Sequence, residues 1–156
     1  MATVERSFTV KQVPEQTFAF VVRRVVTHDE IGEFVTGALR RVGRFASAHG
    51  GAQGPPMSII AAPDEEGGLG FEVGFPVAAG TLAESPVEVR TLPATLAVVH
   101  RHAGPYTDLA ADFYADLFAQ MHTLGYTTVS TPREIYLGGP NVCVPVTEIV
   151  WPIASF

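Results

Sequence analysis

Hydrophobic residues in the first part of the chain change from the spacing of a strand to that of a helix and back. An aromatic and β-branched run turns polar at Thr27, and Glu30 follows at the spacing of a helix-capping box. Apolar residues then recur at helical spacing until Gly50 and Gly51 end the pattern. In chain order the pattern predicts a strand at 18–26, a helix at 31–46, and strands at 57–60 and 71–77.

The second part of the chain repeats this order of elements. Gly104 and Pro105 provide a helix start with proline at the first helical position, and Gly125 ends the helical pattern. The stripe expected to be buried contains Leu109, Phe113, Leu117, Met121 and Leu124. The elements predicted here are a strand at 96–102, a helix between Pro105 and Gly125, and strands at 133–137 and 147–153.

The two parts are related by a repeat at an offset of 76 residues. Residues 56–60 match 132–136, and residues 71–78 match 147–154, with valine exchanging for isoleucine and phenylalanine for tryptophan. The same offset, without a gap, pairs Val13 with Val89 and Val22 with Val98. The repeat predicts an α+β fold of two βαββ modules in one domain, residues 1–156, with a seam that could hold a ligand.

The halves are expected at about 1–78 and 87–156, joined by a linker at 79–86 that is rich in small residues. Residues 10–13 and 87–90 should lead into the first strand of each half. Each helix needs an apolar sheet face to cover, so both helices are expected on one side of antiparallel sheets, with a cleft on the other side. Trp151 and Phe75 should then be buried at equivalent positions.

Strand alternation assigns the side chains of the last two strands to faces. We expect Ile149, Trp151, Ile153, Ile135 and Leu137 beneath the helix, and Glu134, Tyr136 and Glu148 on the face away from it. The first half would add Ser58, Ile60, Glu72 and Gly74 to that helix-free face. Carboxylates beside a tyrosine in an apolar cleft suit an organic cation. Equally, these glutamates could simply line a solvated sheet face.

Composition and charge exclude several classes of function. The chain has 156 residues, of which 47% are hydrophobic and 17% charged, so it can bury a core. Its net charge of −6 argues against direct nucleic-acid binding, which needs a basic face. There is no signal-peptide pattern and no apolar run near the ~20 residues of a membrane span, so a cytoplasmic protein is expected, with no membrane partner.

No cofactor or metal is expected from the motifs. The single cysteine, Cys143, cannot form an internal disulfide or a cysteine-based zinc site. His100 and His102 could provide two metal ligands from one strand face, but the sequence indicates no third ligand. The glycines at 67–70 have neither dinucleotide-binding nor Walker spacing, so they predict a hairpin turn.

Several segments in order resemble one family. These are residues 90–94, 98–106, 132–137 and 146–152, together with 72–77 of the first half. They resemble the GyrI-like small-molecule-binding domain, which is also the effector-binding domain of AraC-type and MerR-type multidrug regulators. The resemblance covers nearly the whole chain and implies two βαββ modules related by a pseudo-twofold axis.

The resemblance also implies the ligand and its contacts. Members commonly bind lipophilic, often cationic or aromatic compounds between the modules, and Glu134 matches their central glutamate. Glu148 matches a second glutamate, and Tyr106 matches the tyrosine that opens the second helix. Ile60 departs from the pattern, because an aromatic residue is frequent there. No helix-turn-helix segment precedes Met1, so a stand-alone binding domain is expected.

The leading functional hypothesis is a protein that sequesters or senses a hydrophobic, cationic or aromatic small molecule. Its expected ligand-binding residues are Glu134, Tyr136, Glu148, Tyr106, Glu72 and Ile60. One alternative is a hydrolase of strained electrophiles with Glu134 as the catalytic group, because burial would raise the pKa of this carboxyl. A second alternative is a protein-interaction role, since one branch of the family modulates DNA gyrase. The sequence leaves enzyme activity open and favours binding without turnover.

Overall fold

The computed structural model describes residues 7–25, 28–61, 65–66, 68–109, 111–138 and 145–154. The chain forms two compact units. We call residues 14–94 the α1 unit, and residues 1–13 together with 95–156 the α2 unit. Each unit is an antiparallel sheet with one long helix, which confirms the α+β class. Thr27 of the expected capping box and Cys143 lie outside the described residues.

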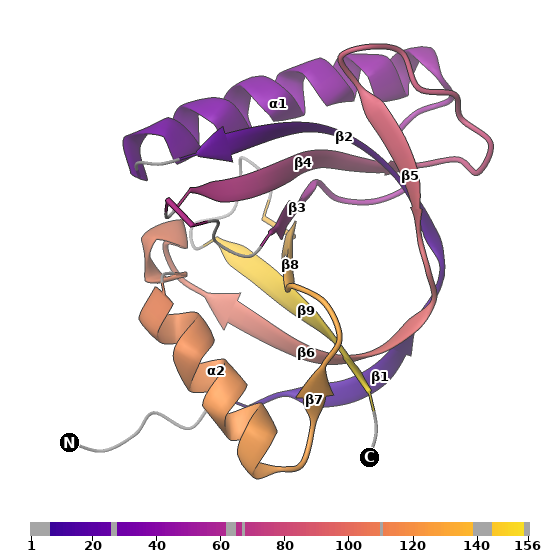
Figure 1. Ribbon diagram of the computed structural model, residues 1–156. Coiled ribbons are helices and arrows are strands. Elements are labelled where there is room, and N and C mark those ends of the chain that lie inside the picture. The colour runs from indigo at the N-terminus through magenta and orange to yellow at the C-terminus, as the bar shows by residue number, and fades with distance from the viewer. Residues whose placement is uncertain are drawn as a thin grey trace. The chain divides into compact units, whose positions relative to one another are not determined.

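The described residues of the α1 unit form four strands and one α-helix. Its elements are β2 (Gln16–Val25), α1 (His28–Ala48), β3 (Met57–Ile60), β4 (Leu69–Val77) and β5 (Glu88–Leu92). The strands are hydrogen-bonded in the order β3-β4-β2-β5, all antiparallel. Figure 1 shows α1 lying along β2 and β4. Of the seven apolar residues at helical spacing in the sequence, Ala38, Val42, Phe45 and Ala46 are buried, and the other three are partly buried: Ile31, Phe34 and Val35.

The α2 unit has a matching arrangement with one short additional strand. Its elements are β1 (Thr9–Val13), β6 (Thr95–Ala103), the 3-10 turn η1 (Tyr106–Asp108), α2 (Ala111–Thr123), β7 (Thr127–Thr128), β8 (Arg133–Tyr136) and β9 (Val146–Ala154). The order is β1-β6-β9-β8, again antiparallel, and β7 pairs with the end of β9. Both units therefore place the strand before the helix next to the last strand of the βαββ series.

Two boundaries differ from the prediction. Pro105 precedes a single 3-10 turn, closed by the Asp108 and Leu109 amides, and α2 begins only at Ala111. Phe113, Leu117 and Met121 are buried as predicted, whereas Leu124 is 63% exposed because α2 ends one residue before it. Residues 9–13 and 88–92 lead into β2 and β6 along the chain, as predicted, but they are separate strands. They form edge strands, in which β1 pairs with β6 and β5 pairs with β2.

The hairpin that ends each unit has the same register. Ser58 lies opposite Val73 just as Glu134 lies opposite Ile149, in keeping with the 76-residue offset. The strand before each helix is shifted. Ala19 lies opposite Phe75, and Val98 lies opposite Trp151. Ala19 and Val98 therefore occupy equivalent positions, and their separation in sequence is three residues longer than the 76-residue offset. The gap-free match of Val22 with Val98 is therefore wrong. The match of Val13 with Val89 is also wrong, because Val89 lies opposite Ala19 whereas Val10 lies opposite Val98.

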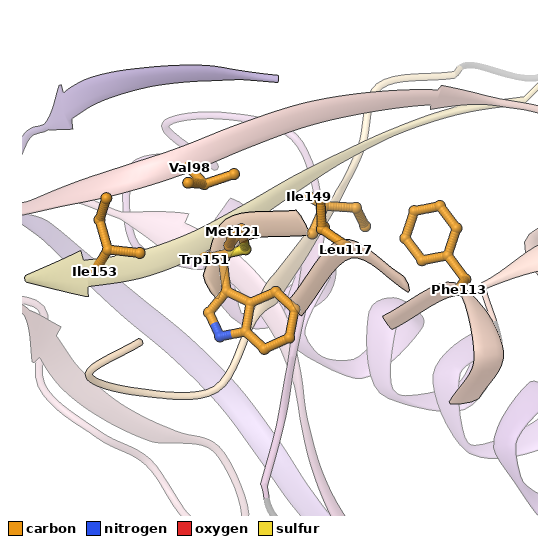
Figure 2. Close-up of a cluster of buried hydrophobic side chains, with 7 residues drawn as sticks. All are labelled: Val98, Phe113, Leu117, Met121, Ile149, Trp151 and Ile153. Atoms are coloured by element: carbon orange, nitrogen blue, oxygen red, sulfur yellow. The ribbon is translucent and has the colours of Figure 1, made fainter. Parts of the chain in front are cut away.

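Each unit has its own hydrophobic core between the helix and the sheet. In the α2 unit the core residues come from β6, α2 and β9 (Figure 2): Val98, Phe113, Leu117, Met121, Ile149, Trp151 and Ile153. In the α1 unit Phe75 packs against the cluster that contains Val42 and Phe45, so Trp151 and Phe75 both face their own helix. Phe75 is only partly buried. Neither helix of the described residues combines the length and apolar character needed to cross a membrane.

Two glycines provide a matched test of this packing. A Cβ atom on Gly74 of β4 would lie 1.9 Å from the carbonyl oxygen of Ala19, so Gly74→Ala forces β2 and β4 apart. It should lower the free energy of unfolding by about 1–3 kcal/mol or more. A Cβ on Gly37 of α1 meets nothing within 4 Å, and Gly37→Ala should raise stability by up to about 1 kcal/mol. Urea denaturation of both variants measures the two changes, and equal midpoints would contradict the close approach at Gly74.

Candidate functional site

A buried carboxyl group is the main polar feature of the α2 unit. Glu134 of β8 is 9% exposed and lies opposite Ile149, one of the residues beneath α2. The Tyr114 hydroxyl, from α2, donates a short hydrogen bond to Oε2 of Glu134. The Tyr136 hydroxyl donates to Oε1 at 3.0 Å. Each oxygen of the Glu134 carboxylate therefore accepts a hydrogen bond from one tyrosine hydroxyl.

Glu134 and Tyr136 face α2, which is the opposite of the prediction. Residues directly opposite each other in an antiparallel pair share a face, so the Glu134–Ile149 pair fixes the orientation of β8. Ile135 instead packs on the other face, with the cluster of Ala97, Val99 and Val150, and Leu137 is exposed. The prediction failed because a shift of one residue in a short strand exchanges its two faces.

The other two predicted glutamates, Glu148 and Glu72, do lie on the sheet face away from the helix of their unit, as predicted. Glu148 lies opposite Ile135, on the face away from Glu134, and pairs with Arg101 at 3.0 Å. In the α1 unit Glu72 pairs with Arg90 at 2.5 Å, whereas Ile60 lies opposite Phe71 and packs against the cluster beneath α1. Ser58 shares the face of Ile60, and Gly74 shares the face of Glu72. The helix-free set predicted for the first half is therefore divided between two faces.

Aromatic rings surround the buried carboxyl. The ring of Tyr106, which is half exposed, meets the ring of Tyr136 edge to face at 5.5 Å. The ring of Tyr114 makes similar contacts with Trp151 at 5.9 Å and with Phe113 at 5.3 Å. The structure thus brings together three of the residues expected to bind the ligand: Glu134, Tyr136 and Tyr106. It does not bring Glu148 to them.

Sequence reasoning missed two polar residues of this site. Tyr114 follows Phe113 of the buried stripe and stands three residues before Leu117, so its position at the edge of that stripe was the available signal. Thr147 of β9 is fully buried and lies opposite both His102 and Tyr136. Its hydroxyl oxygen has no hydrogen-bond partner within the described part of the chain. A buried hydroxyl of this kind can accept or donate a hydrogen bond to a bound group.

The two histidines noted in the sequence also face α2. His100 lies opposite Ile149 and its Nδ1 is 2.6 Å from the carbonyl oxygen of Ser7. His102 Nε2 is 3.1 Å from Oδ2 of Asp108. The rings of both histidines contact Phe113. Among the described residues no three or more potential ligands are grouped as a metal site.

Burial controls the electrostatics of the site. It raises the pKa of the Glu134 carboxyl, and the hydrogen bonds from Tyr114 and Tyr136 oppose that rise to a smaller extent. Burial also raises the pKa of the Tyr114 hydroxyl, and the neighbouring charge of Glu134 adds to this effect. Tyr114 therefore remains a hydrogen-bond donor. The carboxyl can either hold a proton or serve as the counter-ion of a cation.

The structure also has a groove in the α1 unit. It has a volume of about 800 Å³ and lies beside α1, and its lining includes Phe34, Ala38, Arg41, Arg23 and Glu88. Its charged groups have both signs, and none of the polar residues found buried in the described part of the chain lines it. The groove therefore has no buried carboxyl group comparable to that of Glu134 among the residues that line it.

The raised pKa of Glu134 predicts a pH dependence of stability. The folded state holds its proton to higher pH than the unfolded state, so wild-type stability should fall as pH rises from about 4.3 through the raised pKa. Glu134→Gln removes this loss, and its stability relative to wild type should increase across the same window. Tyr114→Phe removes a hydrogen bond that lowers the pKa, so it should extend the window to higher pH. Denaturation at a series of pH values measures this, and a pH-independent difference for Glu134→Gln would contradict it.

Solved structures with this fold match nearly the whole chain. EcmrR, in a complex with DNA, is 19% identical with a TM-score of 0.76; the match covers 96% of this chain and 58% of the EcmrR chain. SAV2435 bound to tetraphenylphosphonium is 13% identical with a TM-score of 0.65, over 95% of this chain and 94% of that one. A hydrolase from Listeria innocua is 15% identical with a TM-score of 0.63, over 96% and 93%.

At these identities the structural matches establish the fold. No curated protein sequence matches the chain significantly. The family of the chain follows from its sequence, because residues 6–154 match the GyrI-like small molecule binding domain. The chain therefore belongs to the GyrI-like family of small-molecule-binding domains.

Proposed function

We propose that this protein binds lipophilic organic cations and that Glu134 is the counter-ion for the bound cation. The observation that carries the proposal is the burial of the Glu134 carboxyl between two tyrosine hydroxyls. A buried carboxylate without a cation is costly, which is why its pKa is raised. A cation that enters the site relieves this cost by pairing with the ionised carboxyl.

The surrounding groups favour a cation with apolar substituents. Two ring pairs lie next to the carboxyl, Tyr106 with Tyr136 and Tyr114 with Trp151. One tyrosine of each pair donates a hydrogen bond to Glu134. Aromatic faces attract cations and also provide apolar surface for rings or alkyl groups. A small hydrated inorganic cation would use only the charge, whereas a lipophilic cation uses both features.

One structural relative gives a suitable probe. SAV2435 has been solved with tetraphenylphosphonium, a cation with four aromatic rings. That binding is a property of SAV2435, which shares 13% identity with this chain. It supports the proposal, since it places a lipophilic cation in a protein of the same fold.

We further infer that the two units are copies of one module and that only one copy carries the binding carboxyl. The two hairpins share the 76-residue register, yet Ser58 and Ile60 occupy the places of Glu134 and Tyr136. The α1 unit therefore has no equivalent acid, and one cation per chain is the expected stoichiometry.

A hydrolase is the second candidate. A carboxyl whose pKa is raised holds its proton to higher pH than an exposed carboxyl and can act as a general acid. The similarity to the hydrolase from Listeria innocua is consistent with this chemistry but concerns the fold. Formation of product from a strained electrophile, lost in Glu134→Gln, would favour turnover over simple binding.

Substitution of Glu134 tests the proposed function. Glu134→Gln keeps the shape and removes the charge, and a charge-assisted contact contributes roughly 1.5–3 kcal/mol, so affinity for tetraphenylphosphonium should fall ten-fold or more. Triphenylphosphine oxide, a neutral aromatic compound, should lose much less. Calorimetry gives both affinities, and the emission of Trp151, the only tryptophan, reports binding because Tyr114 contacts both Glu134 and Trp151.

Glu148→Gln is the matched control, because Glu148 lies on the opposite face and pairs with Arg101. It should leave both affinities within about two-fold of wild type. If Glu148→Gln abolished cation binding and Glu134→Gln did not, the cation would bind on the other face of the sheet. Equal losses for the cation and the neutral compound would show that Glu134 has a structural role.

A further inference from the structure

We infer that His102 and Asp108 are positioning residues that hold η1, and with it Tyr106, against Tyr136, so that they control how fast a ligand leaves Glu134. This inference rests on the proposed function of Glu134. It assigns a role to the two residues whose side chains connect β6 with η1. Neither of them contacts the carboxyl directly in the described structure.

A side-chain pair connects β6 with the end of η1. Nε2 of His102 lies 3.1 Å from Oδ2 of Asp108, and the His102 side chain is only 14% exposed. Asp108 is the last residue of η1 and Tyr106 is the first. The pair therefore fixes one end of the turn, while Tyr106 occupies the other end.

The turn itself is internally closed. The Asp108 amide donates to the carbonyl oxygen of Pro105, and the Leu109 amide donates to that of Tyr106. At its base, the Gly104 amide donates to the carbonyl oxygen of Pro145 at 2.9 Å. A short turn closed in this way moves as one piece, so a contact made at Asp108 restrains Tyr106 as well.

Gly104 makes the contact between His102 and Asp108 possible. A Cβ atom at this position would lie 2.9 Å from Oδ2 of Asp108 and 3.0 Å from Nε2 of His102, too close to both hydrogen-bonding atoms. Gly104 also has a φ of +149°, a conformation that other residues rarely adopt. The backbone thus approaches the pair more closely than a residue with a side chain would allow.

Tyr106 transmits this restraint to the site. Its ring meets the ring of Tyr136 edge to face at 5.5 Å, and the Tyr136 hydroxyl donates to Glu134. Exposure falls from 50% at Tyr106 to 9% at Glu134. Tyr106 therefore stands on the solvent side of the carboxyl, where movement of η1 would open or close the approach to Glu134.

The test compares substitutions that remove the pair with substitutions that keep it. His102→Phe retains the ring beside Phe113 but removes the nitrogen, and Asp108→Ala removes the acceptor. His102→Gln and Asp108→Asn retain a donor and an acceptor, respectively. In stopped-flow experiments with tetraphenylphosphonium, followed by Trp151 emission, the first two variants should dissociate about three- to five-fold faster, the scale of one partly exposed hydrogen bond. The last two variants should remain close to wild type.

The background of Tyr106→Ala separates positioning from general destabilisation. If His102 acts through Tyr106, then His102→Phe should have no further effect on dissociation once the Tyr106 ring is absent. His122→Phe, on an exposed part of α2, is the control for a ring substitution elsewhere. An equal effect of His102→Phe with and without the Tyr106 ring would overturn the inference.

A second measurement needs no ligand. Hydrogen exchange at the Asp108 and Leu109 amides of the free protein should be about three- to five-fold faster in His102→Phe and unchanged in His102→Gln. Unchanged exchange in His102→Phe would overturn the positioning role even if cation binding is confirmed. If Glu134→Gln binds the cation like wild type but exchange responds as expected, the proposed function fails and the restraint on η1 stands.

Discussion

The α2 unit depends on a single electrostatic constraint, the burial of the Glu134 carboxyl beside a hydrophobic core. A buried carboxyl is costly unless it is hydrogen-bonded, protonated or paired with a cation. The hydroxyls of Tyr114 and Tyr136 meet the first condition, and they join α2 and β8 through the carboxyl. The same residues place aromatic rings around it. The raised pKa shows that the hydrogen bonds compensate for burial only in part, which leaves Glu134 able to bind a proton or a cation.

Much of the fold could be predicted because it depends on local patterns. The order of elements followed from three local signals in the sequence. These are the alternation of the strands, the helical stripe that ends before Gly50, and the proline at position 105. The pairing of β1 with β6 and of β5 with β2 could not be predicted in this way, since it joins segments far apart in sequence. For the same reason, the sequence did not reveal that Ala19 and Val98 are equivalent, three residues away from the 76-residue offset. Scattered valines fit a gap-free repeat as easily as a shifted one.

The site was harder to predict than the fold. Glu134, Tyr136 and Tyr106 were identified, but alternation alone does not say which face of a four-residue strand meets the helix. We expected the apolar face of β8 to lie beneath α2, and in the structure α2 instead supplies Tyr114 to a polar face. Glu148 has the same residue type and a similar strand context, yet the register directs it to Arg101 on the other face. The contact of His102 with Asp108 depends on a turn that helical periodicity does not reveal.

The proton balance of cation binding tests the central claim most directly. If Glu134 holds a proton that a cation displaces, calorimetric titration with tetraphenylphosphonium should give an apparent enthalpy that depends on the ionisation enthalpy of the buffer. This dependence should be largest just below the raised pKa of Glu134, where the free carboxyl still holds its proton, and it should be absent in Glu134→Gln. Tight cation binding with the same enthalpy in every buffer across that pH range, or with the same buffer dependence in Glu134→Gln, would contradict the role of this carboxyl.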